Sequence, residues 1–317
     1  MNRIAIELIA PDIDSHRRSA TGVDFVHTFE SGRPGPHVLV NAVTHGNEIC
    51  GALVIDRLLR TDVRPARGTL TLSFANIEAF FRFDPKRPYA TRFIDEDFNR
   101  VWNARTLDGP RDSMELRRAR QLRPFVEAAD FLLDIHSMLE PSPPVMICGP
   151  LDKGIGLAFD VAIPRDIVSD EGHANGTRMR DFEGFGDPAS PKNALLVECG
   201  QHWERAAEQV AWQTTWRFLR HVGIIDPETA AREISSQAPQ PQRLVRVTDA
   251  VVARTPEFRF AREFSGMEVV AHQGDVIAYD GEETVRAPYD NCVLVMPVPN
   301  NVKTGLTAVR LGRIETR

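Results

Sequence analysis

The sequence predicts an α/β fold, with a mixed, mostly parallel sheet flanked by helices and a smaller C-terminal all-β domain. Three observations predict it. From residue 37 to about 223, apolar runs of strand length alternate with amphipathic stretches at helical spacing, a pattern typical of a largely parallel sheet covered on both faces. Residues 225–242 are polar and contain three prolines, which indicates a linker. Beyond residue 242, short apolar runs separated by turn dipeptides such as Asp-Gly predict an all-β unit.

The individual elements follow from the same patterns. We expect strands at 37–44, 68–76, 131–137, 145–149 and 193–200, and helices at 48–60, 113–129 and 203–223. Ser113 is a candidate N-cap for its helix, and Gly223 is placed to end the last one. The predicted division is an α/β domain over residues 1–225, a linker over 226–242 and a β-rich domain over 243–317.

Composition narrows the class of protein. The chain has 317 residues, of which 42 % are hydrophobic and 26 % charged, which is ordinary for a globular protein. Its formal net charge of −6 argues against nucleic acid or an anionic membrane as partner. No apolar run approaches the ~20 residues of a membrane helix, and the N-terminus lacks a signal-peptide pattern. The four cysteines are scattered, which fits a reducing compartment. We therefore expect a cytoplasmic protein.

Chemistry-bearing residues stand where predicted strands end. The stretch VLVNAVTHGNEICGALVI begins as a strand and continues as a helix, with His45 and Glu48 at the junction. Imidazole and carboxylate groups are zinc ligands, and a catalytic zinc ion usually takes three from the protein. His136, at the end of FLLDIHS, is the candidate third ligand. A satisfied polar pair would look the same, so these residues alone leave both interpretations open.

Two further segments extend the candidate site. The loop RFIDEDFNR carries Arg92, Asn99 and Arg100, whose guanidinium and amide groups are suited to binding a carboxylate; a solvated loop is the plainer interpretation. Glu198 lies near the end of the apolar strand ALLVECG. A buried carboxylate there is either a core ion pair or a general base near the metal.

The ordered set THGNE, DFNR, DIHS and VECG resembles the succinylglutamate desuccinylase/aspartoacylase family, a branch of the zinc carboxypeptidase-like superfamily. The resemblance covers roughly residues 38–200 through these motifs, and the added β domain is also typical of that family. It implies that the α/β domain is catalytic and binds one Zn²⁺ per chain through His45, Glu48 and His136. It also implies that Glu198 is the general base that activates a metal-bound water.

The resemblance assigns further roles by position. Arg92 matches the arginine that stabilises the oxyanion, and Asn99 with Arg100 matches the pair that holds the substrate's α-carboxylate. Asp97 matches an acidic position beside that pair, where it would orient the arginines. Tyr289, in the β domain, matches a region from which this family can send a residue towards the active site.

The sequence also departs from the family. Aspartoacylases carry an arginine on the approach to the base glutamate, which binds the substrate's side-chain carboxylate. Here that approach reads GFGDPASPKNALLVE, with only Lys192 as a cation. This departure argues against N-acetylaspartate as the substrate. Arg178, Arg180 or Lys192 could supply a positive charge instead, with Arg178 as the candidate we select, although an ordinary surface residue is the plainer interpretation of each. His173 lies in the same loop region and is not taken as a metal ligand.

The sequence thus predicts a zinc-dependent amidohydrolase that deacylates an N-acyl amino acid or a similar small amide. A zinc carboxypeptidase acting on small peptides is one alternative, and a non-catalytic carboxylate-binding protein is another. A serine hydrolase is disfavoured because the sequence has no G-x-S-x-G motif. The expected partner is a small-molecule substrate, with no nucleic acid and no membrane, and the family's habits suggest a homodimer.

Overall fold

The computed structural model describes residues 5–173, 175–299 and 302–315. Eleven strands form one continuous sheet in the order β1-β3-β2-β4-β7-β5-β6-β8-β14-β13-β10. The strands of its first half are β1 (Val26–Glu30), β2 (His37–Ala42), β3 (Thr69–Phe74), β4 (Phe131–Met138), β5 (Val145–Ile147), β6 (Asp166–Ser169) and β7 (Asn193–Gln201). Each strand that the sequence predicted in this region is present, whereas β1 and β6 were not predicted.

The predicted mixed, mostly parallel sheet is confirmed. Its centre, β3-β2-β4-β7, is parallel, while β1 and β5 run antiparallel to their neighbours β3 and β7. Nearly every residue of β2, β4 and β7 is buried, as expected for strands covered on both faces. Because parallel strands end at the same edge of a sheet, the residues that follow β2 and those that end β4 and β7 come together.

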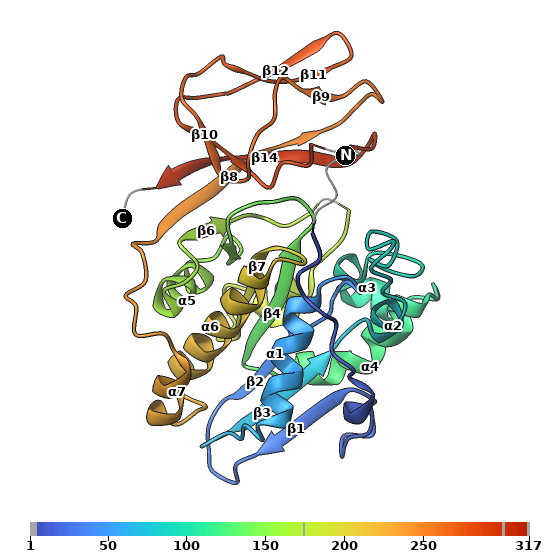
Figure 1. Ribbon diagram of the computed structural model, residues 1–317, viewed down its shortest axis with the longest axis vertical. Coiled ribbons are helices and arrows are strands. Elements are labelled where there is room, and N and C mark those ends of the chain that lie inside the picture. The colour runs from blue at the N-terminus through green and yellow to red at the C-terminus, as the bar shows by residue number, and fades with distance from the viewer. Residues whose placement is uncertain (1–4, 174, 300–301, 316–317) are drawn as a thin grey trace.

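Helices cover both faces of this sheet. On one face, α1, α5 and α6 pack against alternate strand residues such as Val40, Ile135 and Val197 in one large core cluster, and Figure 1 shows α1 and α6 lying across the strands. On the other face, α4 packs against Leu39 and Leu132. The longer helices are α1 (Ile49–Arg60), α4 (Met114–Ala128), α5 (Asp152–Val161) and α6 (Arg205–His221). The short ones are α2 (Ile77–Phe81), α3 (Ala104–Leu107), α7 (Pro227–Glu233) and the 3₁₀ turns Asp14–His16, Phe98–Arg100, Met179–Asp181 and Glu183–Phe185.

Local signals set several of these ends. The hydroxyl of Ser113 accepts a hydrogen bond from the backbone N–H of Leu116, 3.0 Å away, so the predicted N-cap is confirmed. The predicted linker, in contrast, contains α7. Asp226 caps that helix by accepting from the N–H of Thr229, and Pro227 stands in its first turn. The proline that suggested a linker is therefore a helix-starting residue, for which its fixed φ is suited.

Residues 243–315, called the β unit below, hold the remaining strands. These are β8 (Arg243–Val252), β9 (Arg259–Phe260), β10 (Glu268–Val270), β11 (Val276–Asp280), β12 (Glu283–Arg286), β13 (Cys292–Val295) and β14 (Thr307–Glu315). The start of β8 pairs in parallel with β6, and its whole length pairs with β14. The β unit therefore continues the central sheet, and the predicted domain division stays a prediction.

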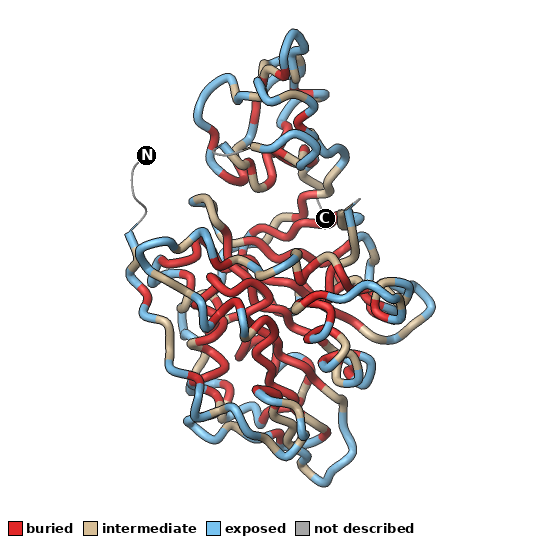
Figure 2. The backbone as a smooth tube through the Cα atoms, turned by 90° about the vertical axis from the view of Figure 1, so that its right-hand side faces the viewer, coloured by how far each residue is buried: buried red, intermediate tan, exposed pale blue. Residues whose placement is uncertain are grey.

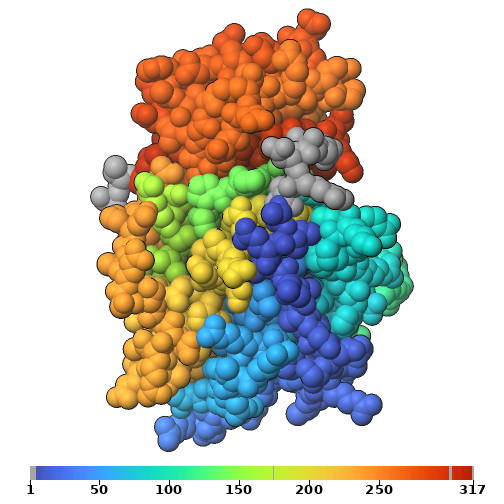
Figure 3. Space-filling view, in the orientation of Figure 1, coloured from blue at the N-terminus to red at the C-terminus, as the bar shows by residue number. Residues whose placement is uncertain are grey.

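The β unit lies over one end of the α/β body. Figure 1 shows β8 and β14 crossing above β6, and Figure 3 shows the unit packed on the segments that follow β4 and β5. Figure 2 shows that the buried residues are concentrated in the larger, lower part of the molecule. Among the described helices, none is both long and apolar enough to cross a bilayer.

Close packing holds the turn between β2 and α1. A Cβ atom added at Gly46 would lie 2.3 Å from the carbonyl carbon of Ala79 and 2.5 Å from the carbonyl oxygen of Thr91. Backbone atoms cannot move aside as a flexible side chain can. The glycine between His45 and Glu48 therefore permits the turn to sit against the neighbouring segments.

We predict that Gly46→Ala lowers the midpoint of thermal unfolding, because overpacking of this kind costs roughly 1–3 kcal/mol. Gly156→Ala in α5 is the matched control, since nothing lies within 4 Å of a Cβ there and alanine favours a helix by up to ~1 kcal/mol. Equal midpoints for Gly46→Ala and the unmodified protein would contradict the close packing of this turn.

Candidate active site

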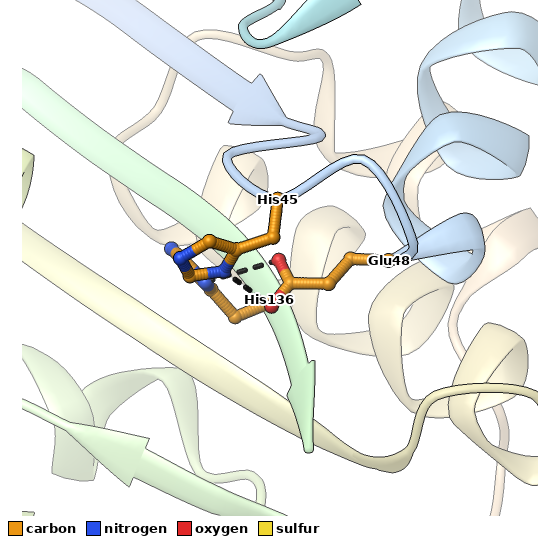
Figure 4. A group of neighbouring side chains, drawn as sticks. All are labelled: His45, Glu48 and His136. Atoms are coloured by element: carbon orange, nitrogen blue, oxygen red, sulfur yellow. Dashed lines mark hydrogen bonds and ion pairs between the residues drawn. The ribbon is translucent and has the colours of Figure 1, made fainter. Parts of the chain in front are cut away.

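Two neighbouring strands bring the predicted metal ligands together. After β2 ends, Val43 adopts a left-handed backbone conformation with φ 63°, which is unfavourable for a β-branched residue and redirects the chain before His45. Glu48 stands immediately before α1, and His136 lies on the adjacent strand β4. Figure 4 shows the three side chains converging between these elements.

The geometry is that of two imidazoles sharing one carboxylate. His45 Nδ1 lies 2.7 Å from Glu48 Oε1, and His136 Nδ1 lies 3.1 Å from Glu48 Oε2. All three side chains are at most 3 % exposed. One ligand atom from each residue lies within 4.8 Å of the other two. The sequence placed His45 and His136 ninety-one positions apart, and the parallel pairing of β2 with β4 joins them.

The chemistry of this set fits a metal ion. Glu48 Oε2 accepts no hydrogen bond despite its burial, so a lone pair remains available inside the cluster. Burial acts to raise the pKa of Glu48, but the neighbouring His136 and His45 outweigh it and hold that pKa well below its usual range. A charged carboxylate with two imidazole nitrogens is the donor set of several catalytic zinc sites.

Each histidine is fixed from its outer side by an aspartate. Asp134 Oδ2 lies 2.7 Å from His136 Nε2, and Asp97 Oδ1 lies 3.0 Å from His45 Nε2. Asp134 is itself held, because its Oδ1 accepts from the side chains of Asn41 and Thr44. Outer carboxylates of this kind orient the ring and leave the opposite nitrogen for the metal. From the family resemblance we expected Asp97 to orient the arginines, and no motif marked Asp134.

Glu198 lies beside the cluster on the next strand. It is the parallel partner of His136 in the pairing of β4 with β7. The residue is 8 % exposed and its Oε2 accepts no hydrogen bond. Burial raises the pKa of Glu198 to about 7, an effect that the charge of His136 opposes and that of Glu48 adds to. A carboxyl group with such a pKa can both take and give a proton near neutrality.

The loop before η2 (Phe98–Arg100) carries the predicted arginines. Arg92 Nη2 lies 3.4 Å from Asp97 Oδ2, and its side chain is 38 % exposed. Asp97 also accepts from the backbone N–H of Asn99. The side-chain oxygen of Asn99 accepts from the N–H of Met179, which leaves its amide hydrogens for another group. Arg100 donates to the carbonyl of Asn99 and contacts His173.

Arg178 is already neutralised within the protein. Its side chain is 2 % exposed, and its three nitrogens donate to Asp170 and Asp181. These carboxylates raise its pKa far above the usual range against the effect of burial. The guanidinium of Arg178 is therefore not available to a substrate carboxylate, and the role predicted for it is wrong. Arg178 instead holds Asp170 in place. Arg180, the other arginine of this loop, donates to the carbonyls of Cys148 and Ala194.

Tyr289 has its described contacts within the β unit. Its hydroxyl lies 2.6 Å from the hydroxyl of Thr248, and the guanidinium of Arg313 lies over its ring at 3.9 Å. The structure therefore does not bring Tyr289 to the histidine cluster.

The β unit instead contributes Arg310. Its Nη2 lies 2.7 Å from Nδ1 of His173, and Arg100 contacts the same ring through Nε2. Sequence reasoning missed Arg310, because it lies in a β strand 137 positions from its partner and no local motif surrounds it.

Known proteins resemble both the sequence and the fold. Residues 34–148 match the model of the succinylglutamate desuccinylase/aspartoacylase catalytic domain. A probable aspartoacylase of Parasynechococcus marenigrum is 40 % identical over 107 residues, which make up 32 % of this chain and 33 % of that protein. The predicted family resemblance is confirmed. The stretch matched to that relative spans about a third of its length. The family-model match over residues 34–148 contains His45, Arg100 and His136 but not Glu198.

Solved structures extend the likeness to the whole fold. A succinylglutamate desuccinylase from Vibrio cholerae superposes with a TM-score of 0.65 at 17 % identity and covers 93 % of this chain and 89 % of that one. A succinylglutamate desuccinylase/aspartoacylase from Rhodobacter sphaeroides gives 0.63 at 17 %, covering 90 % and 87 %. An ectoine utilization protein from Ruegeria pomeroyi gives 0.62 at 17 %, covering 92 % and 89 %. Because these matches cover at least 90 % of this chain, the likeness in fold extends into the β unit.

We predict that Asp134→Asn weakens zinc binding by about 10–100-fold, because the outer partner of a ligating histidine fixes its ring and raises its basicity. The measurement is zinc affinity by competition with a chromogenic chelator. Asp160→Asn, at an exposed position in α5, is the matched control. An affinity for Asp134→Asn equal to that of the control would show that Asp134 does not support a metal ligand.

Proposed function

We propose that this protein is a zinc-dependent hydrolase that cleaves the amide bond of an N-acyl amino acid or a similar small amide. The observation that carries the proposal is the position of Glu198. A buried carboxyl group with an unpaired oxygen stands on the strand next to a His-Glu-His cluster. The resemblance to deacylases over residues 34–148 supports the same reaction.

The metal would be held by His45, Glu48 and His136. When bound there, a zinc ion supplies Lewis acidity for the scissile carbonyl and for water. Asp97 and Asp134 hold the outer nitrogens of the two histidines and so keep their Nδ1 atoms directed at the Glu48 carboxylate. The protein thereby prepares the ligand set before any ion arrives, which reduces the cost of ordering it on binding.

Glu198 would move the proton. Its carboxylate form accepts the proton of the attacking water, and the resulting acid returns a proton to the leaving amine. The raised pKa of about 7 suits both steps, since a general base works best when its pKa is near the working pH. The absence of a hydrogen bond to Glu198 Oε2 leaves that oxygen for water or for the amine.

The arginine loop would bind and polarise the substrate. Arg92, held by Asp97, is placed beside His45 and would stabilise the oxyanion that forms on the carbonyl. Removing one donor of this kind typically costs about 3–4 kcal/mol of transition-state stabilisation. Asn99, through its free amide hydrogens, and Arg100 would hold the α-carboxylate, as charge-assisted bonds to arginine favour.

The test is a hydrolysis screen with purified, zinc-loaded protein. The panel holds N-acetyl, N-formyl and N-succinyl amino acids together with dipeptides, and release of free amine is measured with and without a chelator. Chelator-sensitive cleavage of N-acyl amino acids supports the proposal. Cleavage confined to dipeptides would instead indicate a small-peptide carboxypeptidase. Binding of N-acyl amino acids without cleavage of any panel member would indicate a carboxylate-binding protein.

We predict that Glu198→Gln lowers kcat on the best substrate by at least about a hundredfold, within the range that a general base contributes, while zinc content stays near one ion per chain. Glutamine keeps the size of the side chain but cannot accept the proton. Glu204→Gln, an exposed position beside α6, should retain full turnover. Full activity of Glu198→Gln with zinc bound would exclude Glu198 as the base.

A further inference from the structure

The β unit places a buried arginine at the edge of the candidate site. Arg310 lies on β14, which pairs with β8, and its side chain is only 12 % exposed. Its guanidinium contacts His173 through Nη2, at 2.7 Å from Nδ1 and 3.1 Å from Nε2. Arg100 approaches the same ring, with Nη2 3.2 Å from Nε2. One imidazole is therefore in contact with two guanidinium groups.

His173 cannot give each arginine an acceptor nitrogen of its own. A neutral imidazole has one acceptor nitrogen and one N–H, and a protonated imidazole has no acceptor. Burial, followed by the charges of Arg100 and Arg310, lowers the pKa of His173 to about 2, so the ring is neutral. If Nε2 is the acceptor, Arg100 at 3.2 Å and Arg310 at 3.1 Å must share it; if Nδ1 is the acceptor, it faces Arg310 at 2.7 Å and Arg100 is left opposite an N–H. A buried charged donor whose hydrogen bond is shared or unmade is costly.

Arg310 shares its carboxylate with another arginine. Among the described residues, the carboxylate that pairs with Arg310 is Asp170, whose Oδ2 lies 3.8 Å from Arg310 Nε. Both oxygens of Asp170 already accept hydrogen bonds from Arg178. Burial lowers the pKa of Arg310 and lowers that of Arg100 to about 10. Buried cations that lack their own counter-ion favour binding of an anion.

This cationic pair belongs to the candidate site. Arg100 follows Asn99 in the loop that also carries Asp97, the outer partner of His45. The charge of Glu198 also acts to raise the pKa of Arg310, against the larger effect of burial. The loop of His173 is fixed against Arg100, since a Cβ at Gly176 would lie 2.3 Å from the Arg100 carbonyl oxygen. The backbone that carries Arg100 is therefore packed closely against the segment that follows His173.

We propose that Arg310 is a specificity-determining residue that binds a substrate carboxylate other than the α-carboxylate assigned to Asn99 and Arg100. The inference rests on the proposed deacylase function and names its substrate class. The substrate is an N-acyl amino acid with a second carboxylate, carried by the side chain or by the acyl group. The forked donors of arginine match that group. The β unit thus completes the site, and the arginine absent from the approach to Glu198 is replaced from a distant strand.

The experiment compares matched acid and amide substrates. The pairs are N-acetylaspartate with N-acetylasparagine, N-acetylglutamate with N-acetylglutamine, and N-succinylalanine with its terminal amide. For at least one pair, we expect the unmodified protein to prefer the acid at least tenfold in kcat/KM. Arg310→Gln should reduce that preference to about twofold or less through loss on the acid alone. Arg313→Gln, on the same strand but at an exposed position over the Tyr289 ring, should keep it.

A binding measurement separates this inference from the proposed function. Succinate is titrated calorimetrically into the zinc-loaded protein and both variants, with unfolding midpoints recorded. We expect Arg310→Gln to bind succinate at least tenfold more weakly than Arg313→Gln, and Arg310→Lys, which retains the charge, to fall between them. If hydrolysis occurs with an acid preference that Arg310→Gln leaves intact, or with no acid preference at all, the inference is overturned and the deacylase stands.

If no N-acyl amino acid is hydrolysed, the deacylase proposal fails, and succinate binding alone decides the role of Arg310. Equal succinate affinities of Arg310→Gln and Arg313→Gln overturn that role. If Arg310→Gln unfolds at a markedly lower temperature, Arg310→Lys is compared with the unmodified protein instead. Equal acid preference and equal succinate affinity in Arg310→Lys would count against the forked contact.

Discussion

The arrangement of the site depends on one buried carboxylate. Glu48 stands between two imidazoles in a space that is almost closed to solvent, and it remains charged there because their attraction exceeds the penalty of burial. Removing the carboxylate or the imidazoles would leave the remaining partner without its opposite charge in a low-dielectric interior. Asp97 and Asp134 oppose rotation of the rings from outside. The tight turn at Gly46 keeps the first histidine within reach of the carboxylate.

The sheet distributes the remaining roles along neighbouring strands. The histidines follow β2 and lie on β4, and Glu198 lies on β7 directly beside His136. The sheet then continues through β5 and β6 into β8, which pairs with β14. This continuous hydrogen-bonded path carries Arg310 back to the loop that contains His173. The β unit is therefore joined to the site by the sheet itself, and its position does not depend on a flexible connection.

Charge differs between the two ends of the site. Around the cluster, histidines and carboxylates are paired with one another. At the other end, guanidinium groups outnumber the carboxylates within their reach, because Asp170 and Asp181 are taken up by Arg178. An anionic ligand with its reacting bond towards the cluster and its negative groups towards the arginines would match this distribution. The same asymmetry would speed the encounter with such a ligand at low ionic strength.

The sequence by itself determined what depends on local order. Alternating apolar runs predicted the central strands and the main helices. His45 and Glu48 were recognisable as a pair because they are three positions apart at the end of a predicted strand, where one turn can bring both side chains together. His136, Glu198 and the arginine loop followed from their positions in family motifs. Only the tertiary structure decided which charges are free. Arg178 forms an ion pair with Asp170, and the hydroxyl of Tyr289 pairs with Thr248. Arg310 contacts His173, which lies 137 positions away in the sequence. The physical reason is that ion pairing acts through space, and strand pairing between distant segments sets which groups share that space.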